Sequence, residues 1–218
     1  MTRRCVFITG ASGYMGRSLI TTLLARGHRV RALTREASAH RVPQGAEVVL
    51  GNALDPSTFA DAIAPADTLV HLIGTPHPGP AKAASFQAID LPSVDAALTA
   101  SLSAGIAHFI YVSVAQPAPV MGAYIAVRQA GEERIRASGI PATILRPWYV
   151  LGPGHRWPYL LVPFYAILEL FPATRAGARR LGLVTLEQMV GALVASVEQG
   201  GDGVRVIDVP GIRASSTD

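Results

Sequence analysis

The sequence has 218 residues, half of them hydrophobic, and a formal net charge of +4 at pH 7. It has no stretch of eighteen apolar residues, so we expect no membrane span, and its scattered arginines accompany no nucleic-acid-binding motif. A single cysteine excludes an internal disulfide, and six histidines without ligand spacing argue against a metal site. These properties predict one cytoplasmic domain, residues 1–218, around a single large core.

Strand-like and helix-like patterns alternate from the N-terminus almost to the end. This alternation predicts an α/β fold: a Rossmann-type doubly wound, mostly parallel sheet with helices on both faces and a small C-terminal extension on the substrate side. The expected strands are residues 4–9, 28–34, 46–50, 67–73, 107–114, 141–146 and 204–208. The expected helices are residues 14–26, 56–64, 86–104, 123–138 and 186–199. A capping box of Thr185 and Gln188 starts the last helix.

The first expected strand runs directly into a glycine-rich turn, residues 9–16. Gly10 permits the tight turn, Gly13 lets the backbone approach a pyrophosphate, and Gly16 lets the helix pack against the strand. The free N–H groups of the first helical turn would face the anion. Between a strand and a helix, this pattern predicts a dinucleotide-binding turn, with an ordinary glycine-rich turn as the alternative.

The second expected strand ends at Arg35, where an NAD-specific fold usually has an acidic residue for the ribose 2′-hydroxyl. A basic residue at this point can pair with a 2′-phosphate, so NADP(H) is the expected cofactor. Arg17 could assist. A solvated charge at the strand end is the alternative interpretation of Arg35.

Two stretches interrupt the alternation. Residues 75–80 are rich in proline and glycine and should form a loop at the carboxyl edge of the sheet. The second stretch, the aromatic-rich segment 148–182, holds seven of the chain's fourteen aromatic residues between Trp148 and Phe171. This segment could line an apolar substrate pocket, pack on the sheet as a lid, or contact a second copy or a membrane surface.

These motifs together resemble the short-chain dehydrogenase/reductase superfamily, in its atypical, compact NAD(P)H-binding branch related to NmrA-like and epimerase/dehydratase-like proteins. The resemblance covers residues 1 to about 155 well. Residues 9–16 match its glycine signature, 51–55 its adenine contact, 69–74 its fourth-strand motif, and 144–148 the segment near the nicotinamide. The resemblance implies that the cofactor contacts Gly10, Ala11, Ser12, Gly13, Tyr14, Met15, Gly16, Thr34, Arg35, Asn52, Ala53, Leu54, Leu72, Ile73, Gly74, Tyr124, Arg128, Pro147 and Trp148.

The same resemblance implies a catalytic set of Ser113, Tyr124 and Arg128. Tyr124 would be the general acid, Ser113 would polarise a carbonyl, and Arg128 would supply the cation that a tyrosine, with an ordinary pKa of about 10, needs near neutrality. Arg128 departs from the family's lysine, because arginine keeps the charge but cannot release a proton. Asp90, in place of an asparagine, is a second departure. The alternatives are a surface aromatic for Tyr124 and a strand-end hydroxyl for Ser113.

These features favour an NADPH-dependent oxidoreductase that acts on a small, fairly apolar carbonyl, quinone-like or conjugated substrate, as a monomer or homodimer. A non-catalytic NADP(H)-binding regulatory or assembly protein is the alternative, because the catalytic pattern is altered. A nucleotide-sugar epimerase or dehydratase is less favoured, since the roughly 70 residues after Pro147 are short for a substrate domain. Among the histidines, His71 should be a hydrogen-bonded core residue, whereas His77 and His155 fall in loops beside the expected pocket.

Overall fold

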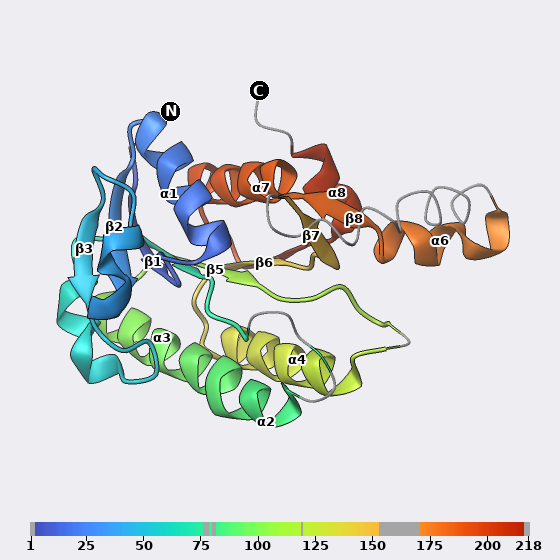
Figure 1. Ribbon diagram of the computed structural model, residues 1–218, viewed down its shortest axis with the longest axis horizontal. Helices are drawn as coiled ribbons and strands as arrows, with labels where there is room; N and C mark the ends of the chain where they lie inside the picture. The colour runs from blue at the N-terminus through green and yellow to red at the C-terminus, as the bar shows by residue number, and fades with distance from the viewer. Residues whose placement is uncertain (1–2, 76–78, 80–81, 119, 153–170, 216–218) are drawn as a thin grey trace.

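The computed structural model describes residues 3–75, 79, 82–118, 120–152 and 171–215, and its centre is a seven-stranded sheet (Figure 1). The strand order is β3-β2-β1-β4-β5-β6-β9, and every neighbouring pair is parallel. The strands are β1 (Cys5–Thr9), β2 (Arg29–Thr34), β3 (Glu47–Leu50), β4 (Thr68–His71), β5 (His108–Val112), β6 (Ala142–Leu145) and β9 (Val204–Ile207). All seven expected strands and the doubly wound fold class are confirmed.

Helices cover both faces of the sheet (Figure 1). One layer contains α1 (Tyr14–Ala25), α7 (Leu186–Gln199) and α8 (Val209–Ala214), and the other contains α3 (Leu91–Ala104) and α4 (Gly122–Ala137). Alternate side chains of β1 supply the two cores, because successive strand residues point to opposite faces. Val6 and Ile8 pack under α1 and α7, whereas Phe7 packs on the α3 side.

Helix α7 begins at the capping box that the sequence predicts. Thr185 accepts a hydrogen bond from the backbone N–H of Gln188, and the Gln188 side chain accepts one from the Thr185 N–H. This reciprocal capping box satisfies two N–H groups that the helix itself cannot pair. The predicted helix, residues 186–199, has the observed bounds.

The prediction of a helix over residues 56–64 is wrong. Two 3₁₀ turns, Pro56–Thr58 and Ala60–Ala62, replace it. Between them Phe59 has φ −146°, which is outside the helical range, and its side chain is buried and stacks on Phe7 at 6.0 Å between ring centroids. Burial of this aromatic ring therefore overrides the local helical pattern.

Other short elements were also outside the prediction. A 3₁₀ turn follows β2 at Glu36–Arg41. The helix expected over residues 86–104 is divided: α2 (Ala83–Ser85) leads into a π-helical turn, Phe86–Asp90, and α3 begins at Leu91. The π turn inserts an extra residue per hydrogen-bonded ring, which rotates the side chains that follow it.

The aromatic-rich segment forms part of a small extension beside the main sheet. Its strand β7 (Tyr149–Leu151) pairs in parallel with β8 (Leu183–Thr185), and α6 (Pro172–Arg180) extends to the right in Figure 1. Four of its aromatic residues, Trp157, Tyr159, Phe164 and Tyr165, lie outside the described residues, as do His77 and His155. A search of the described helices finds none with the length and apolar character that crossing a bilayer requires.

Candidate functional site

The residues expected to hold a cofactor follow the carboxyl ends of five parallel strands, so the sheet gathers them along one edge. The glycine turn follows β1, Arg35 follows β2, residues 52–54 follow β3, residues 72–74 follow β4, and residues 147–148 follow β6. β1 lies between β2 and β4, so the chain order reverses beside the glycine turn. Ligands of open α/β sheets bind at such a switch point.

The glycines of the turn have distinct steric roles. Gly10 has φ +74°, and a Cβ there would lie 2.9 Å from the carbonyl carbon of Leu72 at the end of β4. A Cβ on Gly16 would lie 2.5 Å from the carbonyl oxygen of Gly10 and 2.7 Å from that of Ala11, so Gly16 packs α1 onto the turn itself. Gly13 is exposed and precedes α1 without a side-chain cap. A glycine turn of this shape at the N-terminus of a helix fits a pyrophosphate.

The turn also contacts the C-terminal extension. Gly152 follows β7, and a Cβ built on it would overlap the hydroxyl oxygen of Tyr14 in the first turn of α1. Pro147 is buried, and Trp148 packs partly against the core under α1 and α7. The segment after β6 is therefore fitted against the glycine turn.

At the other end of the edge, Arg35 is exposed, and its side chain makes no hydrogen bond or ion pair with the described residues. Asn52 has a local role, because its Oδ1 accepts a hydrogen bond from the Leu54 N–H at 3.1 Å and its own N–H donates to Thr58 at 2.9 Å. Leu54 exposes 40% of its surface. This corner offers a free guanidinium and an apolar side chain to a nucleotide.

The structure brings Tyr124 and Arg128 together at the start of α4. The guanidinium carbon of Arg128 lies 5.1 Å from the centroid of the Tyr124 ring, which is within cation–π range. The ring of Phe86 packs against Tyr124 from the π turn, with 5.0 Å between centroids. Tyr124 is only partly buried. Its ring is thus held between a cation and an aromatic face while part of it is accessible.

Arg128 is almost fully buried and forms an ion pair with Asp90. Nη2 donates to Oδ1 of Asp90 at 2.7 Å, and Nη1 donates to the hydroxyl of Tyr111 at 3.3 Å and the carbonyl of Val112 at 3.2 Å. Burial alone would lower the pKa of Arg128, but its tyrosine neighbours and Asp90 raise it, so the net shift is upward. The guanidinium therefore stays charged beside Tyr124.

An apolar hollow of about 180 Å³ opens beside Tyr124. Its lining comes from the first turn of α4, the π turn and the preceding loop, and consists of Gly79, Phe86, Met121, Gly122, Ala123 and Tyr124. Met121 has φ +66°, in the left-handed region that side chains other than glycine rarely adopt. Backbone strain of this kind is concentrated at functional sites, and here it lies three residues before Tyr124.

Ser113 belongs to a different cluster. Its hydroxyl donates to Oε1 of Glu132 at 2.6 Å, about two helical turns further along α4 than Tyr124. Because a serine has one O–H proton, Ser113 in this arrangement accepts but does not donate a further hydrogen bond. The structure therefore pairs Tyr124 with Arg128 and places Ser113 with Glu132.

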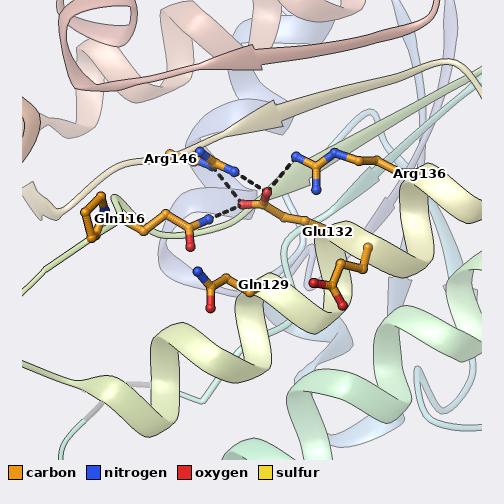
Figure 2. Close-up of a pocket in the computed structure, with 7 residues that line it drawn as sticks. Gln116, Gln129, Glu132, Arg136 and Arg146 are labelled. Atoms are coloured by element: carbon orange, nitrogen blue, oxygen red, sulfur yellow. Dashed lines mark hydrogen bonds and ion pairs between the residues drawn. The ribbon is translucent and has the colours of Figure 1, made fainter.

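Figure 2 shows Glu132 pointing into the centre of this second cluster. Arg146 binds both carboxylate oxygens, at 2.9 and 2.5 Å, Arg136 binds Oε2 at 2.9 Å, and Gln116 donates to Oε1 at 3.0 Å. The residues border an open hollow of about 420 Å³. Burial alone would raise the pKa of Glu132, but hydrogen bonds from Arg146 and Ser113 outweigh it and lower the pKa, so the carboxylate stays ionised.

A series of buried polar contacts leads from Thr9 to Asp90, the partner of Arg128. His71 Nδ1 lies 2.9 Å from the Thr9 hydroxyl, its Nε2 lies 3.2 Å from the Ser93 hydroxyl, and Ser93 donates to the carbonyl of Asp90 at 2.8 Å. His71 is a core histidine, as predicted. Burial, followed by the charge of Arg128, lowers its pKa to about 3, so it is neutral. Within the described ranges, no group of three or more His, Cys, Asp or Glu side chains could hold a metal ion.

Sequence reasoning did not single out Glu132, Thr75, Phe86 or Met121. A signal for Glu132 existed: Tyr124, Arg128 and Glu132 follow at intervals of four, which places them on one face of a helix. Charged residues on a face that also holds Ile125 and Ile135 indicate buried, paired charges. The left-handed Met121 and the π turn carry no comparable sequence signal.

Comparison with known proteins identifies the family. The family described as NAD(P)H-binding matches residues 10–156. The chain belongs to this NAD(P)H-binding family. Its cofactor is therefore a nicotinamide dinucleotide, which agrees with the cradle formed by the glycine turn.

The individual proteins that resemble this chain have low sequence identity to it. Ceramide reductase of Caulobacter vibrioides is 29% identical over 198 residues, which are 88% of this chain and 61% of that protein. A 3 beta-hydroxysteroid dehydrogenase/Delta 5→4-isomerase of Mycobacterium tuberculosis is 32% identical over 115 residues, 50% of this chain and 31% of that protein. The chain therefore spans less than two thirds of either relative. The Bordetella bronchiseptica enzyme WbmH, solved with NAD⁺, has the same fold, with a TM-score of 0.71, 20% identity, and coverage of 95% of this chain and 76% of that one.

Proposed function

We propose that this member of the NAD(P)H-binding family is an NADPH-dependent oxidoreductase that reduces a small, fairly apolar carbonyl, quinone-like or conjugated substrate. The observation that carries the proposal is the placement of Tyr124. Arg128 and Phe86 hold its ring beside an apolar hollow, and Arg128 also contacts Ile73 and Gly74, which are among the expected cofactor residues. An apolar hollow with one polar group suits a substrate whose single polar atom is the reacting oxygen.

In this proposal Tyr124 donates its O–H proton to the substrate oxygen, and Arg128 stabilises the negative charge that develops on the ring oxygen. Phe86 and Met121 exclude water from the reacting oxygen and contact the apolar part of the substrate. A bound nicotinamide cofactor would supply the hydride for the carbonyl carbon. Gly10, Gly13 and Gly16 would hold its pyrophosphate, and the residues after β4 and β6 would hold its nicotinamide half.

The preference for NADPH rests on Arg35. Its exposed guanidinium, free of ion pairs with the described residues, can bind a ribose 2′-phosphate at the end of β2. Arg35→Ala should weaken NADPH binding by about tenfold or more and leave NADH binding nearly unchanged, since a charged hydrogen bond contributes about 1.5–3 kcal/mol. Arg41→Ala, also exposed and in the adjacent 3₁₀ turn, is the matched control. Equal loss for both cofactors would contradict the assignment.

The substrate class is supported by relatives as well as by the hollow. The similar proteins are named a ceramide reductase and a hydroxysteroid dehydrogenase, and both names specify lipid substrates. The test is oxidation of NADPH with a panel of apolar carbonyls and quinones. Tyr124→Phe should lower kcat by about 100-fold or more, the usual contribution of a positioned general acid, with the NADPH dissociation constant unchanged.

A second function is favoured by a specific observation. The Ser113 hydroxyl donates its hydrogen bond to Glu132, and Arg128 forms an ion pair with Asp90, so neither is free to bind a substrate in this arrangement. A non-catalytic NADP(H)-binding regulatory or assembly protein would have these properties. The same experiment separates the two functions, because tight NADPH binding without turnover, unaltered by Tyr124→Phe, would support the binding protein and overturn the oxidoreductase.

A further inference from the structure

The π turn and α4 meet through two pairs of side chains with matching spacing. Phe86 and Asp90 are four residues apart on the π turn, and Tyr124 and Arg128 are four residues apart on α4. Phe86 contacts Tyr124, and Asp90 binds Arg128. Each residue of the Tyr124–Arg128 pair therefore has its own partner on the π turn.

The carboxylate of Asp90 is fully buried, and its hydrogen bonds come from two residues. Arg128 donates to Oδ1 at 2.7 Å, the Thr75 hydroxyl donates to Oδ2 at 2.5 Å, and the Thr75 N–H reaches both oxygens at 3.2 Å. Through the N–H and hydroxyl of Thr75, the chain after β4 fixes the position of this carboxylate. It therefore fixes the direction in which Arg128 points.

Gly74 supplies the space that the guanidinium occupies. A Cβ built on Gly74 would overlap Nη2 of Arg128 and would lie 3.3 Å from Oδ1 of Asp90. Nη1 meanwhile donates to the carbonyl of Ile73 at 3.4 Å, so the guanidinium packs against residues 73–74. A planar guanidinium needs this space, whereas the single ammonium of a lysine does not.

We propose that Asp90 and Gly74 are positioning residues for Arg128 and, through it, for Tyr124, so that the four residues form one coupled unit. The two departures from the family pattern that the sequence shows, at positions 90 and 128, are then a single change: an acid holds the arginine that replaces a lysine. This inference rests on the proposed function where it concerns turnover. The coupling itself concerns only residues of this chain.

A double-mutant cycle on the full chain tests the coupling. Asp90→Asn removes the negative charge that pairs with Arg128, and Arg128→Lys removes the guanidinium that binds Asp90. Each single change should lower kcat by roughly 10- to 100-fold with KM for the carbonyl nearly unchanged, whereas the double variant D90N/R128K should recover to within about fivefold of the starting protein. Losses that multiply in the double variant would overturn the proposal.

A spectroscopic cycle on the same variants keeps the proposal testable if no carbonyl is reduced. With 3-fluorotyrosine incorporated, the ¹⁹F resonance of Tyr124, assigned with Tyr124→Phe, reports its contact with the guanidinium. It should shift in either single variant and return towards its starting position in D90N/R128K. Absence of turnover together with this rescue would reject the oxidoreductase and retain the coupled unit. An unmoved Tyr124 resonance in Asp90→Asn would reject the unit.

Substitution of Gly74 provides a second, independent test with a matched control. In the presence of Arg128, Gly74→Ala should reproduce the loss of kcat and the shifted resonance, because its methyl group takes the place of Nη2. In the R128K background the same change should add less than about twofold, since that space is empty. Gly177→Ala, where a Cβ meets no atom within 4 Å, should change neither readout. Equal effects of Gly74→Ala in both backgrounds would contradict the assignment.

Discussion

Helix α4 contributes a buried charge to each of two clusters, and the two charges are paired in different ways. The Asp90–Arg128 pair is closed: one acid meets one base, and both side chains are at most 5% exposed. The Glu132 cluster is open: a carboxylate that is 1% exposed binds Arg136 and Arg146, whose side chains are 41% and 24% exposed. A closed pair depends on each partner, whereas an open cluster has alternative donors and access to water.

The largest expected effect comes from breaking the closed pair. Asp90→Ala leaves a buried guanidinium without a counter-charge, so we expect a loss of about 3–5 kcal/mol in the free energy of unfolding. Chemical denaturation at neutral pH measures it. A loss below about 1 kcal/mol would mean that water reaches Arg128 and that the cluster is not closed.

Breaking the open cluster should cost less. In Glu132→Ala both arginines can turn to solvent, and the main loss is the set of hydrogen bonds from Ser113 and Gln116, so we expect about 1–3 kcal/mol. The same denaturation measurement applies. If Glu132→Ala proved as costly as Asp90→Ala, the contrast between the clusters would be wrong.

The closed cluster also predicts a pH dependence through His71. Burial and Arg128 lower the pKa of His71 to about 3, and burial with Arg205 lowers that of His108 to about 4, whereas an unfolded histidine titrates near 6.5. Below pH 6.5 the unfolded chain therefore binds protons first. Stability is full above pH 6.5 and falls as the pH decreases, by about 1.4 kcal/mol per pH unit for each histidine well below that value.

Unfolding free energies measured between pH 5 and 6.5 test this dependence. His71→Asn should reduce the slope by about half, since it removes one of the two histidines with a lowered pKa. His40→Asn, at an exposed position, should leave it unchanged. A slope that His71→Asn does not alter would show that the histidine titrates alike in the folded and unfolded chain.

The smallest expected effects lie on the outer side of the same helix. Arg136→Ala removes one of two arginines from Glu132 and should cost about 1 kcal/mol or less, and Arg134→Ala breaks an exposed pair with Asp95 and should cost under about 0.5 kcal/mol. Thermal unfolding of both variants in low and high salt checks the order. A larger loss for Arg134→Ala would contradict it.

The sequence predicted the architecture because strand spacing, glycine positions and the capping box at Thr185 are local signals. Local signals could not predict the break at Phe59, where burial of the ring in the core decides the backbone, nor the parallel pairing of Tyr149–Leu151 with Leu183–Thr185, strands separated by more than thirty residues. The candidate catalytic residues were predicted from a family pattern. That pattern could not show that Ser113 would bind Glu132.

The partnership of Asp90 with Arg128 illustrates a further limit. In the sequence the two residues are 38 positions apart, and each is a separate deviation from a motif. Only the packing of the π turn against α4 brings them within hydrogen-bond distance. The role of Gly74 could not be predicted either. A glycine after a strand can have many functions, and only the three-dimensional structure shows the guanidinium beside it.

The contact between Gly152 and Tyr14 has a consequence for protein engineering. Any side chain at position 152 would displace the tyrosine hydroxyl at the start of α1, next to the nucleotide turn. We therefore expect a chimaera that takes its segment after β6 from another member of the NAD(P)H-binding family to have a disturbed glycine turn unless that donor also has a glycine here. The start of α1 and the segment after β6 must therefore be exchanged together.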